Sequence, residues 1–163
     1  MISAPLGTKK DYLTKFVKAR SEWIMAKQQK IDDRTINLEK DEILLFGKPF
    51  KGSLSEAELR NLLHEKITFY YKKYWPFFAE FGLQPVEFKY RVMKSTWGVC
   101  RPTAGTITFN KRLVHQPVTF IEYVVLHEMC HLLIPNHGRD FYELVASHMP
   151  QFREFKNSML VCG

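Results

Sequence analysis

The segment from Val124 to Gly138 constrains this chain most, because it holds three histidines and a carboxylate at the spacing of a metal site. His127 and His131 are four residues apart, so on a helix both imidazoles leave the same face and can bind one ion. Glu128 lies about 100° further round the helix axis, which leaves its carboxylate available as a base. A catalytic zinc ion usually has three protein ligands, and neutral imidazole is a preferred one. We therefore expect a hydrolytic Zn2+ site with His137 as its third ligand.

The residues around this motif predict where its helix begins and ends. Pro117 or Thr119 can open the helix, and Thr119 and Glu122 have the spacing of a capping box. Pro135 cannot continue a helix, so the motif falls on the last turns. We expect Gly138 to give the backbone freedom that turns the third histidine back toward the first two. The simpler alternative is a buried helix with two satisfied histidines, but two buried imidazoles beside a carboxylate would need partners.

The composition predicts one domain that spans residues 1–163. The chain has 163 residues and is 45% hydrophobic, which is enough for a core. It shows neither a signal peptide nor an apolar run that could span a bilayer, so we expect a cytoplasmic protein without a membrane partner. Its three cysteines, Cys100, Cys130 and Cys162, form no Cys-x-x-Cys pair, which argues against a disulfide framework.

The net charge of +7 would suit nucleic acid, phosphorylated substrates or an anionic surface. The lysines and arginines are spread along the chain, however, in a pattern typical of solvated helix faces. Charge therefore supports a nucleic-acid partner only weakly.

Helical periodicity is present in three further segments. Residues 8–31 predict an amphipathic helix, and residues 55–58 form a capping box that starts a helix continuing toward Phe81. Pro76 should kink or split that second helix. After the metal motif, residues 141–148 predict a last helix closed by Pro150.

Extended segments complete an α+β pattern. Residues 86–92 alternate apolar and polar side chains, which predicts a strand with one buried face, and residues 106–109 predict another. The connection over residues 97–105 is rich in turn residues, so we expect the two strands to form a long hairpin. Residues 42–50 predict a short strand, a glycine turn and a second extended piece. The expected fold has helices packed on a small antiparallel sheet, with the His-Glu-x-x-His helix as the active-site helix.

Several stretches resemble the YgjP-like metallopeptidase domain family. The matching stretches are Trp97-Gly98-x-Cys100, Ile107-x-Phe109-Asn110-x-Arg112-Leu113, Tyr123-Val124-Val125-x-His127-Glu128-x-x-His131 and Asn136-His137-Gly138-x-x-Phe141. This family is a zincin group distantly similar to HtpX-like and SprT-like metallopeptidases, so the resemblance implies a zincin-like fold. It also implies zinc ligands at His127, His131 and His137, with Glu128 as the catalytic base. The family commonly has Ser where this chain has Val99, so no hydroxyl role is assigned there.

The zinc site predicts the type of reaction and leaves the substrate open. In the main hypothesis zinc lowers the pKa of its bound water, Glu128 takes the proton, and the hydroxide attacks a carbonyl or phosphoryl centre. The resemblance implies a metallopeptidase acting on peptides. Because some relatives are described as nucleotide pyrophosphatases, a nucleoside triphosphate (UTP-type) pyrophosphatase is an alternative. A DNA-associated SprT-like protein is a third interpretation.

Residues outside the motif are weaker candidates. For substrate contacts we select Asn110, Arg112 and Tyr142. The residues that could bind phosphates, although surface charge is the favoured interpretation, are Lys94, Arg101, Arg112 and Arg139. The candidate transition-state donors are Asn110, Tyr123, Tyr142 and His148.

Two histidines and one cysteine near the predicted site fit structural roles better than ligand roles. His64 has no metal-ligand neighbours in the sequence, and His115 suits a capping or surface position. Cys130 points away from the two helix histidines, so we expect it to pack in the core.

Overall fold

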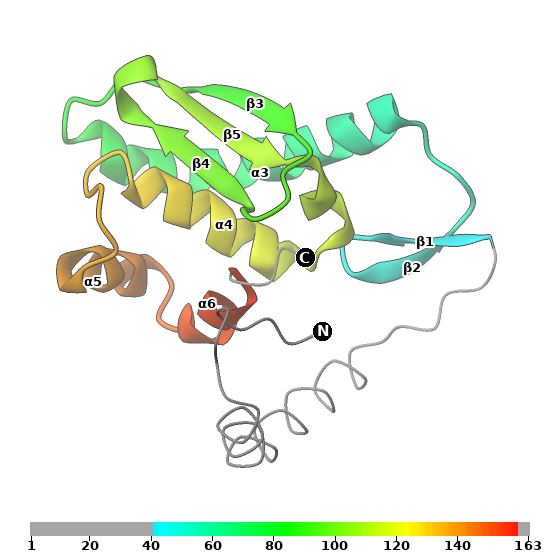
Figure 1. The fold of residues 1–163 in the computed structure, drawn as a ribbon. Helices are drawn as coiled ribbons and strands as arrows, with labels where there is room; N and C mark the ends of the chain where they lie inside the picture. The colour runs from blue at the N-terminus through cyan, green and yellow to red at the C-terminus, as the bar shows by residue number, and fades with distance from the viewer. Residues whose placement is uncertain (1–40, 160–163) are drawn as a thin grey trace, which may run out of the picture. The chain divides into compact units, whose positions relative to one another are not determined.

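The computed structural model describes residues 41–159, with side chains as far as Lys156 (Figure 1). The elements, in chain order, are β1 (Glu42–Leu45), β2 (Lys48–Lys51), α3 (Glu56–Ala79), β3 (Glu87–Arg91), β4 (Gly98–Arg101), the 3-10 helix η1 (Pro102–Ala104), β5 (Thr106–Asn110), the 3-10 helix η2 (Lys111–His115), α4 (Val118–Cys130), α5 (Arg139–His148) and α6 (Arg153–Met159). Helices together with two small sheets confirm the α+β fold class. The helix expected over residues 8–31 and Cys162 lie outside the described residues, and the single domain over residues 1–163 stays a prediction. Within the described range, no helix has the length and apolar character needed to cross a membrane.

The larger sheet is mixed, with the strand order β3-β5-β4. β4 and β5 are antiparallel and are joined through η1, whereas β3 runs parallel to β5. The expected hairpin between residues 86–92 and 106–109 is therefore wrong, as is a purely antiparallel sheet. The true hairpin partner of β5 is β4, which lies inside the connection expected to be turn-rich. A four-residue strand that starts with Gly98 is too short to show a two-residue periodicity.

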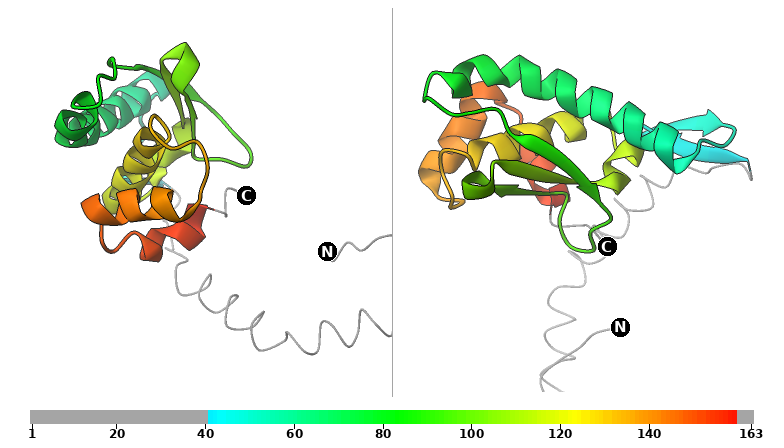
Figure 2. Two further views of the ribbon diagram at one scale, coloured as in Figure 1. Left: turned by 90° about the vertical axis from the view of Figure 1, so that its left-hand side faces the viewer. Right: turned by 90° about the horizontal axis from the view of Figure 1, so that it is seen from above.

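Both long helices pack on one face of this sheet (Figure 2). Directly opposed residues share a face, so the strand register defines which side chains point toward the helices. These residues are Phe88, Tyr90, Gly98, Cys100, Ile107 and Phe109. Tyr71 of α3 meets Phe88 of β3 edge-on, with ring centroids 4.9 Å apart. α4 covers β4, which places the motif helix directly against an edge strand.

Helix α3 begins with the predicted capping box. The Glu58 backbone N–H donates to Ser55 Oγ at 3.3 Å, and the Ser55 N–H donates to a Glu58 carboxylate oxygen at 2.8 Å. The helix runs without interruption through Pro76, so the expected split does not occur. Pro76 is exposed, and apolar residues at helical spacing bury the opposite stripe on both sides of it. The buried residues of this stripe are Leu63, Ile67, Tyr71, Tyr74 and Phe78.

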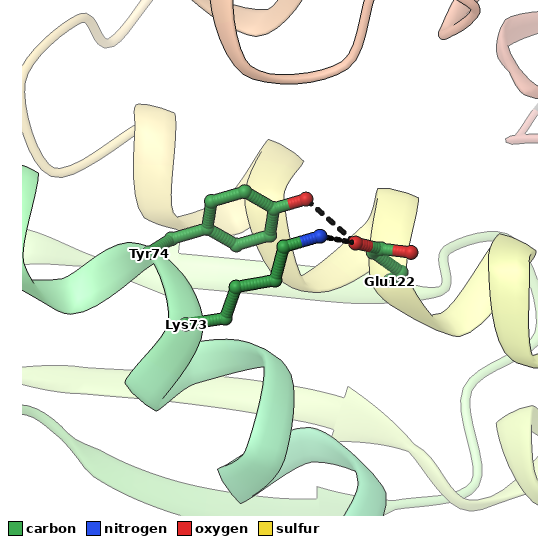
Figure 3. Close-up of polar contacts among 3 residues, drawn as sticks. All are labelled: Lys73, Tyr74 and Glu122. Atoms are coloured by element: carbon green, nitrogen blue, oxygen red, sulfur yellow. Dashed lines mark hydrogen bonds and ion pairs between the residues drawn. The ribbon is translucent and has the colours of Figure 1, made fainter.

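Helix α4 has Pro117 as its N-cap residue and no side-chain cap, so the Thr119–Glu122 capping box does not form. Glu122 instead binds α3 (Figure 3). Its carboxylate oxygen Oε1 accepts hydrogen bonds from the Lys73 ammonium at 2.5 Å and from the Tyr74 hydroxyl at 2.7 Å. A charged partner on a neighbouring helix therefore replaces the local cap, and it ties α4 to α3.

The β1–β2 hairpin confirms the strand-turn-strand prediction for residues 42–50 and docks on the start of α4. Its two turn residues both have positive φ, 53° for Phe46 and 77° for Gly47, as a two-residue hairpin turn requires. A Cβ at Gly47 would lie 2.9 Å from Pro117 Cγ, so the close approach also favours glycine. His115 Nδ1 donates to the Leu44 carbonyl at 2.6 Å, which gives His115 a structural role in this joint.

Candidate functional site

The structure brings the three predicted histidines together around one point. His127 lies in the last turn of α4, His131 caps its C-terminus, and His137 lies in the following loop. The Nε2 atom of His137 is 2.9 Å from Nε2 of His127 and 3.0 Å from Nε2 of His131. All three rings pack around the buried ring of Phe141 in α5, which holds the loop against the helix. Gly138 has φ −78°, so the return of His137 does not depend on the backbone freedom expected of this glycine.

The protonation of the cluster suits a divalent metal ion. His131 Nδ1 lies 3.0 Å from the Ile134 carbonyl oxygen, so Nδ1 carries the proton and Nε2 presents a lone pair. Burial, reinforced by the other two histidines, lowers the pKa of His127 to about 3. Burial also lowers the pKa values of His131 and His137, so all three rings are neutral at neutral pH.

The chemistry of the donor set also fits a bound cation. His127 Nδ1 is buried without a hydrogen-bond partner among the described residues, and its Nε2 faces Nε2 of His137. The donor set of three neutral imidazoles is the one that catalytic zinc sites use.

Glu128 lies beside the cluster in a tight space against β4. Its side chain is buried, and a Cβ at Gly98 would lie 2.5 Å from Glu128 Cγ, so only glycine fits there. The Cys100 backbone N–H donates a hydrogen bond to the Glu128 carboxylate. Burial raises the pKa of Glu128 to about 8, although the Cys100 hydrogen bond acts in the opposite direction. The outcome is a carboxylate fixed in position with a high affinity for a proton.

These groups open into a pocket of about 500 Å³. One wall is β4 with the loop before it, a second is the end of α4, and α5 and α6 contribute Tyr142 and Lys156. Of the described residues that line the pocket, Glu128 is the only carboxylate and Lys156 the only lysine or arginine. The remaining lining is largely apolar and aromatic, which suits an organic substrate with little charge.

Of the three residues selected for substrate contact, only Tyr142 lines the pocket. Asn110 is fully buried, and its amide nitrogen donates to the Met93 and Thr96 carbonyls, both at 2.9 Å. Its side-chain oxygen accepts the Arg112 backbone N–H at 3.2 Å, while the Arg112 side chain is exposed outside the pocket lining. Asn110 therefore shapes the loop that precedes β4 and does not reach into the pocket.

Of the candidate transition-state donors and phosphate-binding residues, some line the pocket and others do not. Tyr123 lines the pocket, and its ring packs edge-on against His127 at 5.7 Å. His148 packs against aromatic rings of α3 instead, with its ring centroid 4.5 Å from that of Phe77. The candidate phosphate-binding residues, none of which lines the pocket, are Lys94, Arg101, Arg112 and Arg139.

Three features of the site were not predicted from the sequence: the contact of Gly98 with Glu128, the hydrogen bond from the Cys100 N–H and the position of the Lys156 side chain. The first two lie in the Trp97-Gly98-x-Cys100 stretch, where the motif was visible but its contact with Glu128 was not. Lys156 carries no sequence signal. Burial raises the pKa of the Cys100 and Cys130 thiols to about 12, so neither is a thiolate ligand at neutral pH. Cys130 is buried in the core, as predicted.

Two histidines at the end of a helix and a third in the following loop converge beside a buried carboxylate, an arrangement typical of metallohydrolases. Within that class, a model of the YgjP-like metallopeptidase domain matches residues 52–160, and the chain belongs to this family. Among solved structures, the chain is similar to the crystal structure of the metallopeptidase zymogen of Pyrococcus abyssi abylysin. The two are 20% identical with a TM-score of 0.47, and the match covers 59% of this chain and 90% of that one. Comparison with curated proteins gave no match.

Proposed function

We propose that the chain is a zinc-dependent metallopeptidase in which Glu128 is the catalytic base. The observation that supports this most strongly is the convergence of three histidine Nε2 atoms beside a buried carboxylate. In this proposal His127, His131 and His137 hold the ion. A zinc ion there would lower the pKa of a water molecule and polarise a carbonyl group.

Glu128 has the surroundings that a catalytic base needs. The Gly98 contact and the Cys100 N–H hold its carboxylate in one place, and no ion pair with a described residue neutralises it. Such a carboxylate can accept a proton from the attacking water and deliver it to the leaving amine. Burial raises the pKa of Glu128, and a cation bound at the three histidines would favour the ionised carboxylate that accepts the proton.

The position of β4 supports a peptide substrate. β4 is an edge strand of its sheet, and its residues line the pocket beside the histidines. The Trp97 carbonyl bonds to Asn110 on the β5 side, whereas the Cys100 N–H is on the other side, toward Glu128. An edge strand can pair with an extended peptide, because both have regularly spaced backbone donors and acceptors. A peptide paired along β4 would pass directly over the candidate metal ligands.

The charge of the pocket argues against a triphosphate substrate. Phosphoryl-transfer sites surround their substrate with several cationic groups. Among the described lining residues, Lys156 is the only such side chain, because the four residues expected to bind phosphates lie elsewhere. Nucleic-acid binding stays a prediction from the net charge.

A side-by-side assay of peptide and nucleoside triphosphate hydrolysis tests the proposal. Zinc-loaded wild type is expected to cleave peptides from a mixed library, and Glu128→Gln should not. Glu122→Gln is the matched control, because it removes a carboxylate from the same helix outside the pocket. Hydrolysis of triphosphate with no peptide cleavage would overturn the proposal.

A further inference from the structure

Lys156 of α6 lies at the pocket in a defined position. Its ammonium nitrogen is 3.7 Å from the centroid of the Tyr142 ring, close enough for a cation–π interaction. Tyr142 stacks on Phe152 on one side, with centroids 5.7 Å apart and ring planes at 15°. It also stacks near His137, with centroids 6.2 Å apart and planes at 25°. The Tyr142 ring therefore contacts both Lys156 and the candidate metal ligand His137.

The charge on Lys156 is available to a ligand. The side chain is exposed, and within the described part of the chain no carboxylate forms an ion pair with it. A cation–π contact uses the charge of the ammonium group but leaves its N–H donors free for an anion. The pocket lining also includes apolar and aromatic residues, for example Trp97, Pro102 and Pro135, together with the hydroxyls of Ser95 and Thr96. Among the described lining residues, Lys156 is thus the single lysine or arginine.

We propose that Lys156 is a specificity-determining residue that binds a carboxylate of the peptide substrate close to the scissile bond. A single ammonium group matches one carboxylate in charge and in size. The proposal rests on the peptidase function proposed above and adds a substrate class to it, namely peptides with a carboxylate near the cleavage point. That carboxylate has two possible sources, the C-terminus of the peptide or an Asp or Glu side chain.

The alternative role for Lys156 is to hold α6 against Tyr142 by the same cation–π contact. The two roles predict different results for Lys156→Met. A structural contact would lower the free energy of unfolding and affect all substrates equally. A carboxylate-binding residue would change KM only for substrates that carry the carboxylate.

The test uses zinc-loaded full-length protein and matched peptide pairs. One pair differs only in a C-terminal acid or amide, and a second set has Glu or Gln at each position flanking the cleaved bond. Wild type is expected to prefer one carboxylate-bearing member about five- to tenfold in kcat/KM, mainly through KM. The pair that shows this preference identifies the source of the carboxylate. Lys156→Met should remove the preference, and Lys156→Arg should keep it.

Lys48→Met is the charge-matched control, because Lys48 lies in the exposed strand β2 outside the pocket lining. Binding of the same peptide pairs to Glu128→Gln, measured without turnover, should show the same carboxylate preference and lose it when Lys156→Met is added.

Equal cleavage of all pairs by wild type would overturn this inference and leave the peptidase function standing. Retention of the carboxylate preference by Lys156→Met would also overturn this inference and leave the peptidase function standing. Absence of cleavage for every peptide would overturn the peptidase function and this inference with it.

Discussion

Helix α4 carries two glutamates whose surroundings differ in nearly every respect. Glu122 is half-buried on the α3 side, where a lysine ammonium and a tyrosine hydroxyl both donate to one carboxylate oxygen (Figure 3). Glu128 is buried on the β4 side, where the described donor is a single backbone N–H. The comparison shows that a glutamate on the same helix can have two different roles. A carboxylate with charged partners holds two helices together, and one buried without a cationic side chain beside it has a raised affinity for a proton.

The largest loss of activity is expected at the three histidines beside Glu128, the candidate metal ligands. His127→Ala removes one of three converging ligands, so the protein should lose its bound zinc and at least about a thousandfold in peptide hydrolysis. His64→Ala is the control, because His64 of α3 is hydrogen-bonded to Tyr90 of β3 and lies outside the cluster. Metal analysis of both purified variants checks this. Equal zinc in His127→Ala and wild type would show that the cluster is not the metal site.

Gly98→Ala tests whether the placement of Glu128 matters as well as its chemistry. The new Cβ would lie 2.5 Å from Glu128 Cγ and 2.6 Å from its Oε1, so the carboxylate or β4 must move. We expect zinc to stay bound while kcat falls about a hundredfold, because a displacement of about 1 Å at a reacting group has that effect. Gly138→Ala is the matched control, since a Cβ there meets nothing within 4 Å. Full activity of Gly98→Ala would mean that the close packing at β4 has no role in the reaction.

The pH dependence of stability in the metal-free protein should distinguish the two glutamates. The folded-state pKa of Glu128 is raised from 4.5 to about 8, so between these values the folded protein binds more protons than the unfolded chain. The free energy of unfolding should therefore decrease as pH rises through this window, by about 1 kcal/mol per pH unit from this group.

Chemical denaturation at several pH values measures this slope. The lowered pKa of His127 acts in the opposite direction between pH 3 and 6.5, but it is common to all variants and cancels in differences. Glu128→Gln should lack the decrease, and Glu122→Gln should retain it. Parallel curves for wild type and Glu128→Gln would contradict the raised pKa.

The smallest effect is expected at the Glu122 joint. Tyr74→Phe removes a buried hydroxyl that donates to Glu122 at 2.7 Å and leaves the aromatic packing unchanged. The free energy of unfolding should fall by about 1 kcal/mol, with kcat close to that of wild type. Urea denaturation and the peptide assay measure both quantities. A large loss of kcat without a loss of stability would show that this joint acts on the reaction.

The sequence predicts features that depend on residues close together in the chain. The four-residue spacing of His127 and His131 predicts a shared helix face, because the helical period is local. The capping box at Ser55 and Glu58 and the turn at Gly47 are equally local, and all of these are present in the structure.

Features that depend on distant contacts could not be predicted in this way. The parallel pairing of β3 with β5 and the contact of Gly98 with Glu128 arise only when the sheet packs on α4. Thr119 and Glu122 have the spacing of a capping box, but the helix has its N-cap at Pro117, and Glu122 bonds to Lys73 of α3 instead. A salt-bridged partner in a packed helix pair offers a charge that a local cap does not.

The central claim is that Glu128 takes part in the reaction whereas Glu122 holds the helix in place. Turnover of a peptide substrate by Glu128→Gln and Glu122→Gln, with bound zinc measured in the same samples, tests it most directly. Glu128→Gln should retain wild-type zinc and lose at least about a thousandfold in kcat, while Glu122→Gln should stay within about threefold of wild type. Zinc-loaded Glu128→Gln that turns over as fast as Glu122→Gln would contradict the claim.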